Sequence, residues 1–276
     1  MSPEAIITDF VAGQLAQPRT RPLVIGLCGA QGSGKSTVAA ALVERFAGAA
    51  TLSLDDLYIP RVERAALARD VHPLFATRGV PGTHDVALGQ NMLAALDRGE
   101  PTSLPRFDKV NDDPAPRTRW PAAPAPCRLL VFEGWCVGAV PQTNAALDTP
   151  VNTLERDEDP QGIWRRASNA ALAGAYQVLF ARIDALVLLA APDIATVVDW
   201  RLQQERALRA AASGVGVMDD AAIGRFVAHY ERLTRHILTE MPGRAYVTVP
   251  LAADRTLRGS PIAIDSAGPQ AVSPHA

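Results

Sequence analysis

The sequence has no excess charge of one sign, few cysteines and no long apolar run. Its 27 lysines and arginines are balanced by 29 aspartates and glutamates, for a net charge of −2, so we expect no nucleic-acid partner. Cys28, Cys127 and Cys136 lack Cys-x-x-Cys spacing, which predicts reduced, packed thiols and a cytoplasmic location. No basic segment followed by an apolar one opens the sequence, and no apolar run approaches the roughly 20 residues that span a bilayer. We therefore expect neither a signal peptide nor a membrane partner.

The clearest motif that is present lies at residues 29–36, which match the P-loop pattern Gly-x-x-x-x-Gly-Lys-Ser/Thr at every specified position. Apolar residues 23–28 predict a buried strand before it, and residues 37–46 predict a helix after it. The alternative, a glycine-rich turn that binds nothing, is disfavoured because strand, loop and helix occur together. In such a loop backbone N–H groups face phosphate oxygens, Lys35 adds a point charge, and the Ser36 hydroxyl can ligate Mg²⁺. We expect a nucleoside triphosphate to be bound by Gly29, Ala30, Gln31, Gly32, Ser33, Gly34, Lys35, Ser36 and Thr37.

Further short apolar runs alternate with helical patterns along the chain. They predict strands at residues 50–54, 128–132, 185–189 and 245–249. Short continuous apolar runs of this kind are typical of a parallel sheet that is covered on both faces. The sequence therefore predicts an α/β fold of three layers, with a five-stranded parallel sheet and helices on both faces.

The organisation along the chain predicts one main domain, at residues 1–251. A helix at 4–16 precedes the first strand, and Asp193 and Asp219 are expected to cap two later helices. The long Pro-rich stretch within about 58–126 is expected to build an acceptor site. A helical lid is expected at about 193–218, and the Ala-, Ser-, Pro- and Gly-rich residues 252–276 predict a disordered tail.

Acidic residues follow two of the predicted strands. Asp55 and Asp56 come after the second strand, and Glu133 comes after the third. Ligands of parallel sheets bind at the carboxyl ends of the strands, so Asp55 suits a base that takes a hydroxyl proton and Glu133 suits a site for Mg²⁺. The alternatives are an ordinary turn or helix cap at Asp55–Asp56 and a solvated strand end at Glu133.

Basic residues gather in three further places. Arg78 and His84 lie in one loop, and Arg106 and Lys109 lie in another, where they could bind an anionic substrate. The alternative is a solvated loop. A third group, Arg201, Glu205 and Arg209, is spaced by four residues along one helix and could be a surface ion-pair ladder or a set of lid arginines that reach the transferred phosphoryl group.

Several blocks together resemble a known superfamily. Besides the P-loop, Ser-Leu-Asp-Asp-Leu-Tyr at 53–58 and Val-Phe-Glu-Gly-Trp at 131–135 resemble the phosphoribulokinase/uridine kinase/pantothenate kinase superfamily of P-loop kinases. Within it the chain is most similar to the D-glycerate 3-kinases of the plant type and their bacterial relatives. Further blocks that carry this likeness lie at 78–85, 105–109, 151–155 and 200–205. The likeness runs from about Pro22 to Leu251.

The resemblance implies a small-molecule kinase that uses ATP and Mg²⁺ and phosphorylates a small hydroxy acid, D-glycerate, to 3-phosphoglycerate. Lys35 and Ser36 then match the residues that bind the ATP phosphates and Mg²⁺, Asp55 matches the catalytic base, Glu133 matches the acidic residue at the strand end, and Arg201 and Arg209 match the lid arginines. Leu57 departs from the Phe of the family pattern Asp-x-Phe-Tyr. By the same likeness the acceptor would be bound by Asp56, Tyr58, Arg78, His84, Arg106 and Lys109.

Two alternatives remain open at this point. The first is the same fold with pantothenate, a nucleoside or a sugar phosphate as acceptor; the aromatic content of 5% disfavours a nucleoside. The second is a P-loop ATPase or regulatory nucleotide-binding protein without an acceptor, which would not need Asp55. No Asn-Lys-x-Asp signature of a GTPase occurs in the sequence.

Overall fold

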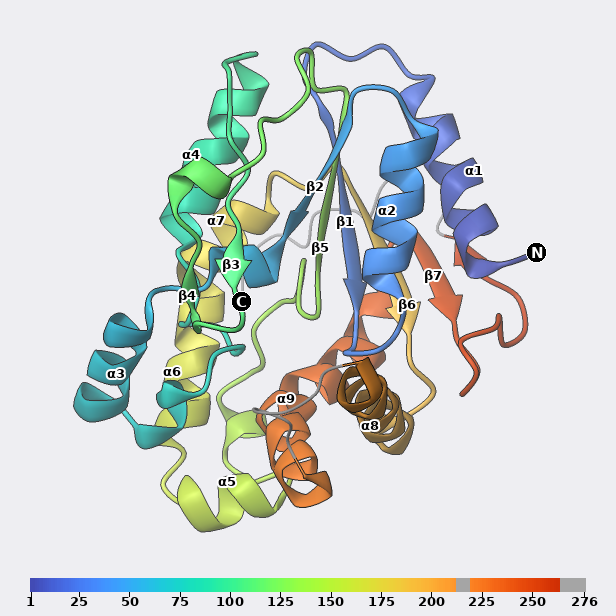
Figure 1. Cartoon of the computed structure of the whole chain (residues 1–276). Helices are drawn as coiled ribbons and strands as arrows, with labels where there is room; N and C mark the ends of the chain where they lie inside the picture. Colours follow the sequence, from blue (N-terminus) through green and yellow to red (C-terminus); the bar gives the residue numbers. More distant parts are fainter. Residues whose placement is uncertain (212–218, 264–276) are drawn as a thin grey trace.

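A mostly parallel β-sheet forms the centre of the molecule (Figure 1). The structure, a computed structural model, describes residues 1–211 and 219–263, without the side chains of 207–211. The sheet has six strands in the order β2 (Ala49–Ser53), β5 (Leu129–Gly134), β1 (Leu23–Gly29), β6 (Ala185–Ala190), β7 (Val247–Pro250) and β8 (Ile262–Ala263). The first five are parallel, as predicted, and β8 pairs antiparallel with β7 at the edge. The predicted α/β class is confirmed.

Each central strand is buried on both faces, which explains its continuous apolar sequence. In β1, Leu23, Ile25 and Leu27 face one apolar cluster, while Val24 and Cys28 face the other. Burying one such aliphatic side chain stabilises a fold by about 1.5–3 kcal/mol, so alternate residues of one strand hold both helical layers in place. The sheet is therefore the rigid frame from which the loops of the site extend.

The helices cover the sheet on both sides (Figure 1). On one face α1 and α2 pack with parts of α8 and α9, and on the other α4 and α7 pack with the opposite side of α9. The caps predicted at Asp193 and Asp219 are present, since their carboxylates accept N–H bonds of 2.7 Å from Thr196 and Ala222. The helices are α1 (Pro3–Leu15), α2 (Lys35–Arg45), α3 (Arg61–Asp70), α4 (Val86–Asp97), α5 (Thr153–Glu158), α6 (Ile163–Ala171), α7 (Gln177–Phe180), α8 (Ile194–Ala211) and α9 (Asp220–Glu240). A π-helical segment, Leu172–Tyr176, joins α6 to α7.

The expected acceptor-site insertion contains more regular structure than its Pro-rich sequence indicated. It holds α3 and α4 and a short hairpin of β3 (Phe107–Asp108) and β4 (Asp113–Pro114). The hairpin was not expected from the sequence, because strands of two residues leave no periodic pattern. This hairpin matters for the site described below.

The region expected to be a disordered tail is structured in its first half. Residues 252–263 form a turn and then β8, while residues 264–276 lie outside the described part of the chain. The residues expected to form a lid, about 193–218, contain α8, while residues 212–218 also lie outside that part; the role as a lid stays a prediction. All three cysteines are free thiols, and burial raises the pKa of Cys28 to about 12, in line with the packed thiols expected. No helix of the described residues is long and apolar enough to cross a membrane.

Candidate active site

The carboxyl ends of three neighbouring strands open into one cavity. Strand β1 leads into the P-loop, β2 leads into Leu54–Leu57, and β5 ends at Glu133 and Gly134 (Figure 1). The cavity has a volume of about 600 Å³. Its walls are formed by Gln31, Gly32, Lys35, Ser36, Ser53, Asp55, Tyr58, Arg78, Lys109, Glu133, Trp135, Arg201, Gln204, Phe226 and Tyr230.

The P-loop has the backbone that an anion site requires. Gly32 and Gly34 adopt φ values of 77° and 90°, and Gly34 begins α2 without a side-chain cap on the helix N–H groups. The free N–H groups and positive end of this 11-residue helix therefore face the cavity. A side chain at Gly32 would overlap Trp200 of α8, so the loop packs directly against that helix. This arrangement fits the phosphates of a nucleotide.

Ser36 and Glu133 form a pair of oxygen ligands beside the P-loop. The Ser36 hydroxyl donates to Glu133 Oε1 at 3.1 Å. Glu133 is 5% exposed, and its Oε2 atom has no hydrogen-bond partner among the described residues. A buried carboxylate with one free oxygen next to a hydroxyl suits Mg²⁺, which prefers oxygen ligands and takes the rest from phosphates and water. Residues 1–211 and 219–263 contain no group of three or more His, Cys, Asp or Glu side chains that could hold a metal ion.

Asp55 is held by two neighbours. Tyr58 donates its hydroxyl hydrogen to Asp55 Oδ1 at 2.8 Å, and the Lys109 ammonium donates to Oδ2 at 2.8 Å. Burial by itself raises the pKa of Asp55, but the charge and hydrogen bond of Lys109, with Lys35 and Tyr58, outweigh burial and lower it to about 2. Asp55 is therefore ionised at neutral pH and oriented toward the cavity by its partners.

Asp56 and Arg106 lie behind the cavity wall. The Asp56 carboxylate accepts the Phe107 N–H at 3.0 Å and a guanidinium hydrogen of Arg106 at 3.4 Å. Burial raises the pKa of Asp56 above its usual range, against the opposing effect of those two partners. The pair anchors β3, the strand next to Lys109. A direct contact of Asp56 or Arg106 with the acceptor stays a prediction.

His84 also lies behind the wall. Its ring stacks on Tyr58 with ring centres 4.6 Å apart, and Nδ1 lies 2.6 Å from the Tyr176 hydroxyl. Burial lowers the pKa of His84 to about 3, so the ring is neutral. In this position the side chain supports Tyr58, which in turn orients Asp55. Its predicted contact with the acceptor is likewise untested.

Four cationic side chains line the cavity: Lys35, Arg78, Lys109 and Arg201. Arg78 pairs with Asp112 and lies 5.5 Å above the Phe107 ring. Arg201 pairs with Glu205 at 2.8 Å and lies 5.4 Å above the Phe226 ring. The side chain of Arg209, the second predicted lid arginine, lies outside the described residues. The cavity thus combines the ionised carboxylate of Asp55 with several cations that suit anionic ligands.

Sequence reasoning missed three aromatic residues of the wall and its neighbour Arg255. Tyr230 packs against both Trp135 and Phe226; the Trp135 indole donates to Gly79 O at 2.9 Å, and the Tyr230 hydroxyl donates to Arg78 O at 3.0 Å. On α9, Phe226 and Tyr230 belong to an apolar stripe that reads as core, so only the fold shows that they border the cavity. Arg255 lay in the expected tail.

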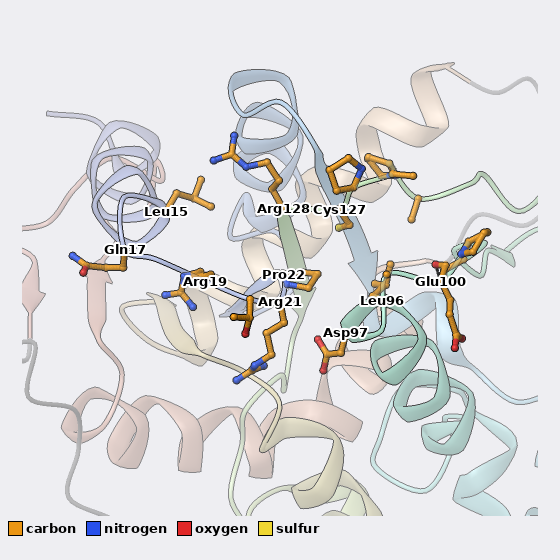
Figure 2. Close-up of a pocket in the computed structure, with 18 residues that line it drawn as sticks. Leu15, Gln17, Arg19, Arg21, Pro22, Leu96, Asp97, Glu100, Cys127 and Arg128 are labelled. Carbon is orange, nitrogen blue, oxygen red and sulfur yellow. Dashed lines mark hydrogen bonds between the residues drawn. The ribbon is translucent and has the colours of Figure 1, made fainter.

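A second cavity lies at the opposite end of the sheet, where β1 and β5 begin (Figure 2). It has a volume of about 510 Å³ and is bordered by several arginines. Figure 2 shows the guanidinium groups of Arg21 and Arg128 pointing to opposite sides, and Arg21 pairs with Asp184 at 2.9 Å. These cations do not converge on one ligand position, so this cavity lacks the arrangement that makes the first one a candidate active site.

Comparison with known proteins agrees with this geometry. Residues 24–152 match the profile of the Phosphoribulokinase / Uridine kinase family. The "Uncharacterized kinase mug58" of Schizosaccharomyces pombe is 37% identical over 248 residues, which cover 83% of this chain and 87% of that protein. The chloroplastic D-glycerate 3-kinase of Arabidopsis thaliana is 33% identical over 224 residues, covering 76% of this chain and 46% of the plant protein. Among solved structures, a D-glycerate 3-kinase from Cryptococcus neoformans has the same fold, with a TM-score of 0.76, 24% identity, and coverage of 95% and 99% of the two chains.

Proposed function

Because the chain belongs to the phosphoribulokinase/uridine kinase family and is an ATP-dependent kinase, we propose that it transfers the γ-phosphoryl group of ATP to D-glycerate, forming 3-phosphoglycerate. The observation that carries the choice of a hydroxy acid is the contact of Lys109 with Asp55 at 2.8 Å. This contact places a cation beside the proposed base. When the hydroxyl of a hydroxy acid contacts Asp55, the carboxylate of the same molecule would lie close to Lys109. The 33% identity to a plant D-glycerate 3-kinase supports this choice.

The acceptor side of the cavity suits a small carboxylate. Lys109 reaches into it from the hairpin, and Arg78 borders it from the loop before α4. Both cations pair with protein carboxylates, Lys109 with Asp55 and Arg78 with Asp112. A substrate carboxylate can replace either protein carboxylate, because it offers the cation the same two charged oxygen acceptors. A sugar phosphate would use the same cations, so the assay below includes one.

The proposed chemistry begins with the state of Asp55. While Lys109 holds its carboxylate, Asp55 is a weak base, with its pKa at about 2. When the substrate carboxylate takes over Lys109, Asp55 Oδ2 becomes free to accept the hydrogen of the acceptor hydroxyl. The base thus gains strength when the acceptor is bound, which favours transfer to the acceptor over transfer to water.

The donor side supplies charge stabilisation. Lys35 and the N–H groups at the start of α2 would hold the β- and γ-phosphates, and Arg201 would approach the transferred group from α8. Ser36 and Glu133 would hold Mg²⁺ or its water shell, and bound Mg²⁺ supplies neutralisation of charge on the phosphate oxygens. In the transition state, negative charge is spread over the phosphoryl oxygens. The rate then depends on how well these cations and the acceptor hydroxyl are aligned with the γ-phosphoryl group.

The aromatic wall gives a reason to test a nucleoside acceptor as the second candidate. Tyr58, Trp135, Phe226 and Tyr230 all border the cavity, although aromatic residues are scarce in the sequence as a whole. However, Trp135 and Tyr230 meet edge to face at 82°, so they pack on one another instead of forming a parallel pair that could enclose a base. The wall geometry favours the hydroxy acid.

One assay separates these activities. Purified protein is incubated with Mg-ATP and, separately, with D-glycerate, L-glycerate, pantothenate, uridine and ribulose 5-phosphate, and ADP release is followed. We expect ADP release that depends on D-glycerate and a phosphorylated product identical to 3-phosphoglycerate by mass and chromatography. Release with uridine or ribulose 5-phosphate and not with glycerate would contradict the acceptor, and release that is independent of every acceptor would contradict the proposed transfer to a hydroxyl.

A further inference from the structure

The segment that follows β7 touches two parts of the nucleotide side of the site. Arg255 donates from Nε to the carbonyl of Gly32 in the P-loop and from Nη2 to the Gln203 side chain of α8 at 3.0 Å. Its guanidinium also lies 5.2 Å from the centre of the Trp200 ring on the same helix. One side chain therefore joins the P-loop to the helix that carries Arg201.

The contacts are reciprocal. The Trp200 indole N–H donates to the carbonyl of Ala253 at 2.6 Å, and Trp200 is 0% exposed. Gly32 packs against the backbone and Cβ of Trp200 so closely that it has no space for a side chain of its own. P-loop, α8 and residues 252–258 thus form one packed unit.

The peptide that joins Gly32 to Ser33 is held at both ends. Its carbonyl accepts from Arg255, and its N–H donates to the carbonyl of Ala30 at 3.2 Å. Because a peptide group is planar, two such bonds fix its rotation and therefore the path of the loop into α2. The N–H groups of the next residues, at the start of α2, are the ones that face the cavity.

The backbone of Arg255 indicates that its position is enforced. Its φ is 67°, one of two positive φ values at non-glycine positions in the described chain. A turn encloses it, with Ala252 donating to Thr256 at 2.8 Å and Arg255 donating back to Ala252 at 2.9 Å. A residue stays in this sparsely populated conformation only where surrounding contacts determine it.

We propose that Arg255 is a positioning residue for the nucleotide. By binding both the Gly32 carbonyl and the Gln203 side chain, it holds the P-loop and α8 in the relative position that phosphate binding requires. The side chain acts through Gly32 and Gln203 and does not border the cavity itself. The proposal depends on nucleotide binding by the P-loop and not on the identity of the acceptor.

The test measures nucleotide affinity without any acceptor. Mg-ADP binding is measured by calorimetry for the wild type, Arg255→Ala and Arg255→Lys, together with the unfolding midpoint of each protein with and without Mg-ADP. Arg258→Ala is the matched control, because Arg258 is an exposed arginine on the same segment and its side chain makes no hydrogen bond to the P-loop or α8 among the described residues. It removes the same charge from the same segment.

We expect Arg255→Ala to weaken Mg-ADP binding by about 10- to 100-fold, because the variant loses a charge-assisted hydrogen bond. Addition of Mg-ADP should also raise its unfolding midpoint by less than it raises that of the wild type. Arg255→Lys should recover part of the affinity, because lysine can donate to Gly32 but cannot also reach Gln203 in a planar fork. Arg258→Ala should bind like the wild type.

Affinity of Arg255→Ala within twofold of the wild type, or equal losses in Arg255→Ala and Arg258→Ala, would overturn the proposal. A lower unfolding midpoint with unchanged affinity would also overturn it, because the role would then be structural only. If Arg255→Ala does not fold, Gln203→Ala and Arg255→Lys carry the test, and wild-type affinity in both would contradict the proposed link. If the proposed acceptor proves wrong, these binding results are unaffected.

Discussion

Ser36 and Glu133 are 97 positions apart in the sequence, yet the hydroxyl of the first donates to the carboxylate of the second at 3.1 Å. The sheet brings them together, because β1 and β5 are parallel neighbours with Cys28 level with Gly134. The P-loop that follows β1 therefore turns back over the end of β5. The contact joins the two residues expected from sequence to hold Mg²⁺, and their assignment as metal ligands is open to a direct test.

The first prediction concerns Glu133→Gln, which keeps the shape of the side chain and removes its charge. We expect the Mg²⁺ concentration needed for half-maximal rate to rise by roughly 10- to 100-fold, as for loss of a group that orients a metal or its water shell. The measurement is the rate as a function of Mg²⁺ at fixed ATP. Glu44→Gln, an exposed glutamate on α2, is the control and should behave as the wild type. An unchanged Mg²⁺ dependence in Glu133→Gln would remove Glu133 from this role.

The second prediction separates the adjacent carboxylates Asp55 and Asp56. Asp55→Asn should lower kcat by about 10²- to 10⁴-fold, the usual contribution of a general base, while ATP affinity stays the same. Asp56→Asn should instead raise KM for the acceptor, because the Asp56 carboxylate anchors Phe107 and the hairpin that carries Lys109. Steady-state kinetics with both substrates varied distinguish the two effects. Near-normal kcat in Asp55→Asn would mean that another group takes the proton.

The third prediction concerns pH and Lys109→Met. Lys109 lowers the pKa of Asp55, so its removal should raise that pKa by roughly one to three pH units, since burial still opposes the charged form. In the wild type the pKa is about 2, so Asp55 stays ionised through the whole range of a normal assay. In the variant the acid limb of the kcat/KM profile should move to higher pH. On acidification, Lys109→Met should therefore lose activity before the wild type does.

The control for this shift is Arg119→Met. Arg119 is a mostly exposed cation that pairs with Asp108 of the same hairpin at 3.4 Å and does not border the cavity. The pH profile of Arg119→Met should follow that of the wild type. If the profiles of Lys109→Met and the wild type superimpose, the pair between Lys109 and Asp55 does not control the base.

The strands and the strand-end residues were predictable because both depend on local patterns. A strand buried on both faces needs consecutive apolar residues, so β1, β5 and β6 are visible as short apolar runs. Parallel strands point the same way, so the residues after them meet at one edge, as Lys35, Asp55 and Glu133 do. The helix after the P-loop was also expected, and α2 begins two positions earlier than predicted because Lys35 and Ser36 already have helical backbone.

The features that were not predicted depend on long-range contacts. Asp55 and Asp56 are adjacent in the sequence, but Asp55 faces the cavity and Asp56 binds the backbone of Phe107. This difference depends on how the hairpin packs against them. Arg255 lies in a segment with the composition of a tail, and its order comes from contacts with Gly32 and Gln203 that are distant in sequence. Composition describes what a segment can do alone and not what the rest of the fold imposes on it.

The last prediction uses two glycines to separate backbone cost from crowding at the cavity wall. Gly79 has a φ of 135° and Gly99 a φ of 68°, so alanine is strained at both positions. At Gly99 an added Cβ meets nothing within 4 Å, whereas at Gly79 it would overlap the Tyr230 hydroxyl. Gly99→Ala should therefore cost about 1 kcal/mol of unfolding free energy from the backbone alone. Gly79→Ala should cost about 2–4 kcal/mol, because crowding adds to this and Tyr230 loses its bond to Arg78 O. It should also raise KM for the substrates, since a displaced Tyr230 enters the cavity. Urea unfolding and steady-state kinetics of both variants measure this, and equal losses would show that Tyr230 yields without cost.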